Sequence, residues 1–560
     1  MRITLRHKYD TFVYCKKQHQ LTNMSFDEKS KIWRGPVRAS RFGPKDSVGT
    51  VLLKYLLENP EHKAQICFQS GIELTNRQVA LFSIQIAEYF QKQLQIPQGT
   101  IIGLCAGNSD YVTPLFLGSL LAGLTLSTLD PSFGVNGIKH IYAITRPRLM
   151  FCDGKIYTKM KQALDECDLH STVIYTVRNH IEGVPSIEDF LKYTSQINPS
   201  LYKAVNLQQG PNQVAAILCS SGTTGLPKGV NMSHAALLAL GESMLNDKPC
   251  ENLLCFSSLY WLSGVIGIMR SILTKTTYII SEAPFCPEDF FAIVERYRVA
   301  AVLGPPSHMA LCFTSNMLSE CDLSSIVDYA VGGSRVSYSL IEKFQKYAPN
   351  ATYKVAYGTS EVCVIVSSGM VEPTNSVGFL KANVEVKIIN AHGESMGPNE
   401  VGEICIRTKL PWAGYFNNPK ATKAIYDDDL WIHSGDMGYF NNAMQLYIVD
   451  RKKDILKYNN FHYTPSSIER VLSQIPGVAD VCVVGIPDDC MGSLPAAAVI
   501  KCINSDVNEL QIHEYASEHL EHFEQLRGGI HFLEDFPRTV SGKTIRREVA
   551  TICEQLRKIK

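Results

Sequence analysis

The chain has 560 residues, of which 45% are hydrophobic and 19% charged, and its 54 basic side chains balance 54 acidic ones. This composition excludes extended disorder, and the zero net charge argues against a nucleic-acid partner, because nucleic-acid binding needs a concentrated basic face. A length this far above that of one hydrophobic core predicts at least two domains.

The chain ends and the cysteines predict a compartment. Residues 1–23 are basic and polar without the apolar run of a signal peptide, so we interpret them as an extension, with a mitochondrial presequence as the alternative. The 17 cysteines contain no C-x-x-C pair, which is typical of free thiols in a reducing compartment. The last residues, RKIK, are not the S-K-L peroxisomal address. We therefore expect a cytoplasmic protein.

The first part of the chain alternates short β-branched apolar runs with helix-length amphipathic stretches. This pattern predicts strands at 101–105, 149–152, 214–219, 299–303 and 328–331, and helices at 78–94 and 338–346. Such alternation indicates an α/β fold with mostly parallel strands. Residues 111–129 and 253–269 are uncharged and long enough to cross a membrane, but their serines and glycines favour buried helices, so we expect no transmembrane span.

After about residue 401 the alternation of strands and helices gives way to short predicted strands at 403–407 and 446–449. A charged stretch at 451–454 then precedes a smaller unit with helices at 465–474 and 507–519 and strands at 479–486 and 496–501. We place a domain boundary between Asp450 and Arg451. This predicts a large domain at 24–450 and a small α+β domain at 451–560.

The segment that decides the chemistry follows the predicted strand at 214–219. Residues 220–229 read SSGTTGLPKG, which combines hydroxyl donors, glycines that let backbone N–H groups approach closely, and one lysine. These groups suit a phosphate chain. The Walker A pattern does not fit, because Pro227 precedes Lys228 and no Ser or Thr follows it. A flexible surface turn is the alternative interpretation.

This segment resembles the signature phosphate loop of the adenylate-forming enzymes, which include acyl-CoA synthetases, coumarate-CoA ligases, beetle luciferases and peptide-synthetase adenylation domains. The resemblance runs from about residue 24 to 560 and looks strongest to the insect luciferase-like acyl-CoA synthetases. It implies a large N-terminal domain of α/β subdomains and a small α+β C-terminal domain that acts as a lid on a hinge.

The resemblance also implies roles for the residues in four ordered motifs. The phosphate loop would bind ATP through Ser220, Ser221, Gly222 and Gly225, with Thr223, Thr224 and Lys228 acting in catalysis. V-G-G-S-R at 331–335 would supply Gly333, Ser334 and Arg335 to the adenine, and Y-G-T-S-E at 357–361 would supply Tyr357, Gly358 and Ser360 to the nucleotide. Glu361 would bind Mg²⁺, which favours carboxylates combined with phosphate oxygens.

The remaining motifs lie nearer the C-terminus. By resemblance, Asp436 in S-G-D and Arg451 would hold the ribose, and Lys453 would be the hinge. Lys543 in P-R-T-V-S-G-K would be the catalytic lysine, neutralising charge on the substrate carboxylate and the α-phosphate. Taken alone, the charge run at 451–454 would be a solvated face.

Two departures from the family pattern concern the acyl and thiol pocket. Tyr260 and Trp261 stand where luciferases have two histidines, which puts luciferin oxidation in doubt; Trp261 would line the acyl pocket or simply pack in the core. Asn460 stands where relatives that form thioesters have a glycine after the hinge. Asparagine tolerates left-handed backbone, so the turn is expected to survive.

The sequence therefore predicts ATP-dependent activation of a carboxylic acid, a medium- or long-chain fatty acid, to an acyl adenylate. Transfer to coenzyme A would then give acyl-CoA, AMP and pyrophosphate. The alternatives are transfer to another acceptor, weak light emission with a luciferin, or a catalytically silent nucleotide- or acyl-binding protein. The expected partners are these small molecules, and the oligomeric state is left open.

Overall fold

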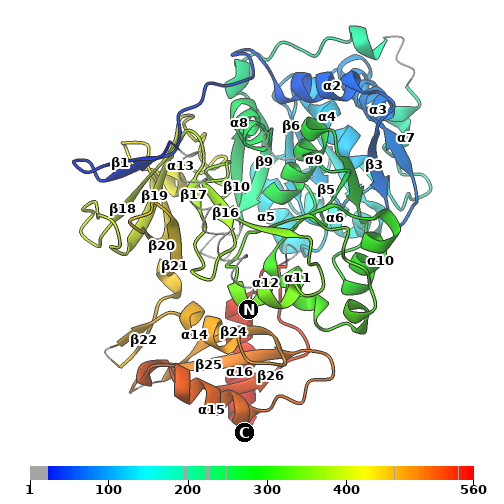
Figure 1. Cartoon of the computed structure of the whole chain (residues 1–560). Helices are drawn as coiled ribbons and strands as arrows, with labels where there is room; N and C mark the ends of the chain where they lie inside the picture. The colour runs from blue at the N-terminus through cyan, green and yellow to red at the C-terminus, as the bar shows by residue number, and fades with distance from the viewer. Residues whose placement is uncertain are drawn as a thin grey trace.

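The computed structural model describes residues 23–193, 198–220, 227–245, 249–459, 461–488, 490–539 and 542–559. Within these ranges the strands form four sheets, three in a large N-terminal domain and one in a small C-terminal domain. In Figure 1 the C-terminal domain, coloured orange to red, lies against one end of the large domain. This architecture confirms the predicted fold class.

The first sheet has the strand order β10-β9-β6-β5-β7-β8 and is parallel except for β10, which forms a hairpin with β9. Its central strands are almost entirely buried, as expected for a parallel sheet covered on both faces. The strands are β5 (Ile101–Cys105), β6 (Thr125–Leu129), β7 (Leu149–Asp153), β8 (Val173–Arg178), β9 (Val214–Ser220) and β10 (Lys228–Ser233). The strands predicted in this region are confirmed.

The second sheet has the order β17-β16-β15-β14-β13-β11-β12-β3-β4, with parallel strands in the middle and antiparallel ones at both edges. Gly333, directly after β14 of this sheet, lies close to Lys543 of the C-terminal domain. Its strands are β3 (Lys63–Cys67), β4 (Glu73–Thr75), β11 (Asn252–Leu254), β12 (Thr277–Ile280), β13 (Ala301–Gly304), β14 (Asp328–Gly332), β15 (Thr352–Tyr357), β16 (Ser367–Met370) and β17 (Phe379–Leu380).

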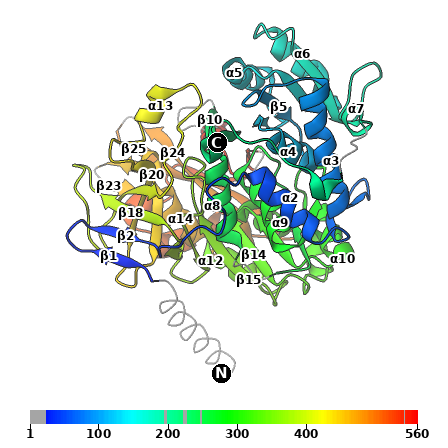
Figure 2. The same cartoon turned by 90° about the horizontal axis from the view of Figure 1, so that it is seen from above.

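Helices join these two sheets into one core. Side chains of α2 (Val48–Glu58), α3 (Asn76–Glu88), α4 (Val112–Leu121), α8 (His234–Met244) and α9 (Leu262–Thr274) share a buried apolar cluster with both sheets. Figure 2 shows these helices gathered between the two sheets. The outer helices are α5 (Val135–Thr145), α6 (Tyr157–Asp165), α7 (Glu188–Leu191), α10 (Pro287–Tyr297), α11 (Pro306–Cys312) and α12 (Tyr338–Phe344).

The two uncharged stretches fold as parts of this core. Residues 111–129 hold the wholly buried α4 followed by β6, and residues 253–269 run from β11 into α9. In the described part of the chain, no helix has both the length and the apolar character needed to cross a bilayer.

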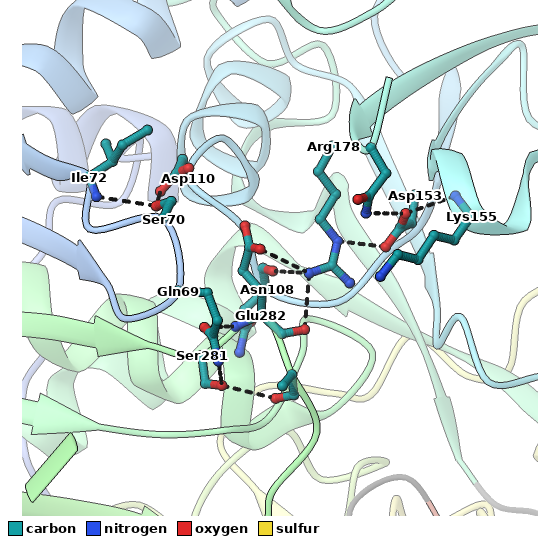
Figure 3. A network of polar contacts seen from close by, with 12 residues as sticks. Gln69, Ser70, Ile72, Asn108, Asp110, Asp153, Lys155, Arg178, Ser281 and Glu282 are labelled. Atoms are coloured by element: carbon teal, nitrogen blue, oxygen red, sulfur yellow. Dashed lines mark hydrogen bonds and ion pairs between the residues drawn. The ribbon is translucent and has the colours of Figure 1, made fainter. Parts of the chain in front are cut away.

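A polar network ties the two sheets together where their loops meet (Figure 3). The Arg178 guanidinium, at the end of β8, contacts the Asp153 carboxylate at 2.6 Å and donates to the backbone carbonyls of Asn108 and Glu282 at 3.4 and 3.0 Å. The Gln69 side chain accepts from the Glu282 backbone N–H at 2.8 Å. These bonds pair polar groups that are mostly part-buried, and they link loops of the two sheets.

The third sheet is antiparallel throughout, with the order β1-β2-β18-β19-β20-β21. The Trp33 ring stacks on Phe440 with centroids 4.5 Å apart, which anchors the N-terminal hairpin. The elements are β1 (Ser25–Asp27), β2 (Ile32–Arg34), β18 (Val384–Ile389), β19 (Gly402–Thr408), β20 (Ile432–Phe440), β21 (Leu446–Arg451) and the short helix α13 (Pro419–Lys423).

The C-terminal domain is built on the long hairpin of β24 (Val478–Asp488) and β25 (Gly492–Lys501). Helices α14 and α16 pack against β24, and an apolar cluster from this domain continues into α10, α11 and α12 of the large domain. The other elements are β22 (Leu456–Tyr458), β23 (Phe461–Tyr463), β26 (Gly529–Phe532), α14 (Pro465–Leu472), α15 (Glu509–His519) and α16 (Arg546–Ile559). The predicted helices and strands are confirmed; the boundary after Asp450 and the hinge at Lys453 stay predictions.

Candidate active site

The predicted phosphate loop joins the two strands of a hairpin. Strand β9 ends at Ser220, and Lys228 is the first residue of β10, directly opposite it. The predictions for Ser221, Gly222, Thr223, Thr224 and Gly225 fall outside the described residues. The hairpin fixes both ends of the loop.

An aromatic side chain that the sequence did not reveal connects Lys228 with the predicted metal ligand. The Lys228 ammonium lies 5.1 Å from the centre of the Tyr415 ring, and the Tyr415 hydroxyl donates to the Glu361 carboxylate at 2.7 Å. Tyr415 is positioned because Phe416 and Gly414 bond to the backbone of β10. No spacing in the sequence relates residue 415 to residue 361, so only the tertiary structure could identify it.

The predicted ribose residues converge on one carboxylate. Asp436 on β20 faces Arg451 on the paired β21, and the Arg451 guanidinium contacts the Asp436 carboxylate at 2.7 Å. The Tyr357 hydroxyl, at the end of β15, donates to the other oxygen of Asp436 at 2.8 Å. Burial raises the pKa of Asp436, and the adjacent Arg451 opposes that shift. Three separate sequence motifs therefore meet here.

The predicted adenine residues follow two parallel strands of the second sheet. Gly333 comes after β14, and Gly358 and Ser360 lie in the turn after β15 that leads to Glu361. A side chain at 358 would collide with the backbone oxygen of Val364. Ser334 and Arg335 follow Gly333 in the chain. Burial lowers the pKa of Arg335, although the nearby carboxylates of Glu469, which lies on α14 of the C-terminal domain, and of Asp450 act to raise it.

Lys543 reaches into the large domain from the C-terminal domain. Its Cε lies 3.4 Å from where a Cβ of Gly333 would stand, and its ammonium lies 5.9 Å from the centre of the Trp261 ring. Asp436 and Glu361 both raise the pKa of Lys543, but burial, the largest effect, and Arg451 lower it, to about 8. The predicted catalytic lysine is thus brought to the predicted ribose and metal residues.

Glycine at 542 lets the lysine loop dock. Gly542 has a φ of +77°, a conformation that favours glycine, and a Cβ there would lie 2.7 Å from the Ser307 Oγ of α11. His308 beside it stacks on Phe285 with centroids 3.9 Å apart. Burial lowers the pKa of His308 to about 3, with a further contribution from Arg538. Ser307 and His308 are docking residues that sequence reasoning missed.

The predicted pocket and hinge residues have different surroundings. Tyr260 is buried and meets Trp261 in an edge-on contact with centroids 4.5 Å apart, while the indole nitrogen of Trp261 is buried without a hydrogen-bond partner in the described part of the protein. Lys453 is exposed in a short turn after β21. The prediction for Asn460 falls outside the described residues.

A cavity of about 990 Å³ opens beside Glu361. Most of its exposed wall is apolar. Leu238 of α8, Ile365, Phe379 and Trp412 contribute to that wall, and Arg38 and Lys409 add cationic groups. The cavity therefore has room for a hydrophobic molecule larger than a single aromatic ring, with Glu361 among its lining residues.

Comparison with known proteins agrees with this geometry. Residues 55–416 match the AMP-binding enzyme family, and residues 467–543 match the AMP-binding enzyme C-terminal domain. The chain belongs to the AMP-binding enzyme family. It is therefore related to adenylate-forming acid-CoA ligases, and the use of ATP and coenzyme A fits this family.

Relatives with established names fall into two groups. The chain is 28% identical to a luciferin 4-monooxygenase of Photuris pensylvanica, covering 89% of this chain and 92% of that protein. It is also 28% identical to the 4-coumarate-CoA ligase 1 of Narcissus pseudonarcissus, covering 85% of this chain and 88% of that protein. The chain is thus similar both to luciferases and to acid-CoA ligases.

Solved structures share the fold. The anthranilate CoA ligase AuaEII, in complex with anthranoyl-AMP, superposes with a TM-score of 0.82 at 18% identity, covering 92% of this chain and 98% of that one. The luciferase-like enzyme of the nonluminescent mealworm Zophobas morio gives a TM-score of 0.67 at 22% identity, covering 75% and 99%.

Proposed function

We propose that the protein activates a medium- or long-chain fatty acid as an acyl adenylate and then transfers the acyl group to coenzyme A. The observation that carries the adenylation step is the approach of Lys543 to Gly333, Asp436 and Glu361. Cationic and nucleotide-binding groups from both domains thereby surround one point, as a reaction between two anions requires.

The first step joins the acid to AMP. A carboxylate oxygen of the acid attacks the α-phosphorus of ATP, the bond to the bridging oxygen breaks, and pyrophosphate leaves with its electron pair. Lys543 would hold the carboxylate and the α-phosphate, and Lys228 would hold the departing phosphates. Asp436, Arg451 and Tyr357 would orient the ribose and adenine, so that the reacting atoms meet in line.

Glu361 is suited to hold a magnesium ion. Its carboxylate accepts from Tyr415, and no basic side chain within the described ranges forms an ion pair with it, so an oxygen is left for a cation. Mg²⁺ bound there would neutralise charge on the phosphates of ATP. Tyr415 would orient the carboxylate for this task.

The second step needs a different arrangement of the two domains. The thiol of coenzyme A attacks the acyl carbonyl of the adenylate and AMP leaves, a step in which Lys543 has no part. We propose that rotation of the C-terminal domain about Lys453 withdraws Lys543 and admits the thiol to the adenylate. The closed form would protect the adenylate from water.

We assign the fatty acid chain to the cavity beside Glu361, whose lining residues do not include Tyr260 and Trp261, the residues predicted for the acyl pocket. The size of this cavity, about 990 Å³, exceeds the need of a single aromatic ring, and its walls are mainly apolar. The relatives named as 4-coumarate-CoA ligases and the anthranilate ligase make an aromatic acid the alternative, and Trp261 and Tyr260 are rings against which such an acid could pack.

The wild-type protein should catalyse exchange of labelled pyrophosphate into ATP that depends on added acid, with the fastest exchange for saturated acids of medium to long chain. Ala239 lines the cavity, and Ala239→Trp should shift the optimum to shorter acids by filling space. Ala424→Trp, at an exposed position, is the control. A preference for coumarate over every fatty acid would overturn the substrate assignment, and no exchange with any acid would overturn adenylation.

Transfer to coenzyme A is tested separately, by AMP release. With the preferred acid, release of AMP should rise with coenzyme A and yield one thioester per AMP. If AMP release is insensitive to coenzyme A, the acceptor is another molecule.

Adenylation should lose activity at high pH. Lys543 acts as a cation, and because its pKa is lowered to about 8 by burial, the free enzyme loses that charge as the pH rises through 8. The kcat/KM for pyrophosphate exchange should therefore be level below pH 8 and fall about tenfold per pH unit above it. Lys543→Arg, which stays charged, should remove this decline while lowering the overall rate. A flat profile for the wild-type protein to pH 10 would contradict the assignment.

A further inference from the structure

A lysine of the large domain donates hydrogen bonds to backbone carbonyls at and after the end of a helix in the C-terminal domain. Lys343 lies on α12, and its ammonium donates to the backbone carbonyl of Ser473 at 2.7 Å, of Val478 at 3.2 Å and of Ile475 at 3.4 Å. Ser473 is the residue that ends α14. Figure 1 shows α12 on the side of the large domain that faces α14 and β24.

These acceptors are well matched to a cation. The Ser473 carbonyl lies at the C-terminal end of α14, where carbonyls lack partners within the helix and the helix dipole is negative, and the Ile475 and Val478 carbonyls follow it. An ammonium group with its three donors can satisfy three carbonyls at once. Burial lowers the pKa of Lys343, so the contact is costly for the ammonium unless the carbonyls stay in place.

Hydroxyl groups extend the contact. The Ser473 hydroxyl lies 2.9 Å from the Ser339 hydroxyl and 3.3 Å from the Ser337 hydroxyl, both at the start of α12. Lys346, on the turn that follows α12, is exposed by contrast. Beside the apolar contacts of α12, Lys343 and these serines form its polar contact with the C-terminal domain, which we call the α12 latch.

We infer that Lys343 is a positioning residue for adenylation, which acts by holding the C-terminal domain where Lys543 reaches the reaction site. This inference rests on the proposed function and names a residue outside the nucleotide- and acid-binding groups. Lys543 and α14 belong to the same domain, so the contact made by Lys343 exists in the arrangement that also brings Lys543 to Gly333.

The latch must open for the second step. A rotation of the C-terminal domain about Lys453 that withdraws Lys543 also moves the carbonyls of Ser473, Ile475 and Val478. Because Lys343 stays with the large domain, its ammonium cannot keep all three hydrogen bonds. Lys343 therefore stabilises only the adenylating arrangement. Removing it should favour the other arrangement, because a contact made in one of two states shifts the population between them.

The test measures the two half-reactions of Lys343→Met separately. Pyrophosphate exchange should fall about tenfold in kcat, with little change in the KM for ATP, because the competent population is reduced while the nucleotide site is intact. Thioester formation from a supplied acyl adenylate and coenzyme A should stay the same or rise. Lys343→Arg, which keeps a charged donor group, should restore part of the exchange. Lys346→Met should match the wild-type protein in both assays.

The outcomes separate this inference from the proposed function. Normal exchange by Lys343→Met, or an equal loss in both half-reactions, would overturn the role of the latch. An absence of exchange in the wild-type protein would instead overturn the proposed function. Should Lys343→Met fail to fold, the double variant Ser339→Ala/Ser473→Ala carries the same prediction, with a smaller loss of exchange, about threefold, and no loss of transfer.

Discussion

Replacing Lys543 by alanine should slow adenylation about 10²- to 10³-fold while leaving thioester formation from a supplied acyl adenylate largely intact. The Lys543 ammonium is the group of the C-terminal domain that approaches Gly333, Asp436 and Glu361, and a preorganised charge of this kind is worth about 10²–10³ in rate. The loss should be in kcat for pyrophosphate exchange, with the KM for ATP changing little, because the interaction strengthens as charge moves in the transition state.

Two comparisons make this prediction specific. Lys558, on the C-terminal helix of the same domain, is exposed, so Lys558→Ala should leave both half-reactions unchanged. Lys543→Arg should retain part of the exchange, since its charge is kept but its planar head is a poor substitute for a compact ammonium. Equal loss of adenylation and transfer in Lys543→Ala would contradict the two arrangements of the C-terminal domain.

Most of the fold could be predicted because its elements have simple local signals. The buried strands at 101–105 and 214–219 are runs of β-branched and apolar residues, and the structure places β5 and β9 there. The hairpin of β1 and β2 was not predicted, because strands this short carry almost no periodic signal. It is held by pairing with β18, far along the chain, and by the stacking of Trp33 on Phe440.

The site was predictable where its residues belong to recognisable motifs. Asp436, Tyr357 and Arg451 come from three motifs far apart in the sequence, and the structure brings them within hydrogen-bonding distance. Tyr415 and Lys343 belong to none, and their roles depend on partners that only the tertiary structure supplies, namely the Glu361 carboxylate and the carbonyls at the end of α14. A single sequence contains no trace of such pairings.

The candidate site residues of the two domains are held in place in different ways. The proposed nucleotide contacts such as Asp436 lie on strands fixed by the large core. Lys543 instead lies on a loop that contacts Ser307, and in our proposal its position also depends on the α12 latch. In the proposed mechanism, rigid strands hold the substrate, and the docked loop adds the positive charge of Lys543. Variants of the first kind, on strands of the large domain, should therefore raise the KM for ATP. Variants of the second kind, at Lys543 or its docking contacts, should lower kcat.

Asp436→Ala is the test of the first kind and should raise the KM for ATP about 30- to 100-fold. A buried carboxylate that accepts the ribose hydroxyls makes charged hydrogen bonds worth about 2–3 kcal/mol in all, and alanine offers none. The change also frees the Arg451 guanidinium and leaves the Tyr357 hydroxyl without its acceptor, so a loss of about 1–3 kcal/mol in unfolding free energy is expected. Both are measurable, by exchange kinetics over a range of ATP and by denaturant unfolding.

Asp436→Asn separates the ribose contact from this structural loss. The amide keeps an acceptor for Tyr357 and the volume of the side chain, so stability should largely recover while the KM for ATP stays about tenfold above that of the wild-type protein, because the charge is missing. Asp429→Ala, at an exposed position on the preceding loop, should change neither quantity. If Asp436→Ala lowered kcat with an unaltered KM for ATP, Asp436 would serve the reacting groups and not the ribose, and the nucleotide would have to be anchored through Tyr357 and Arg451 alone.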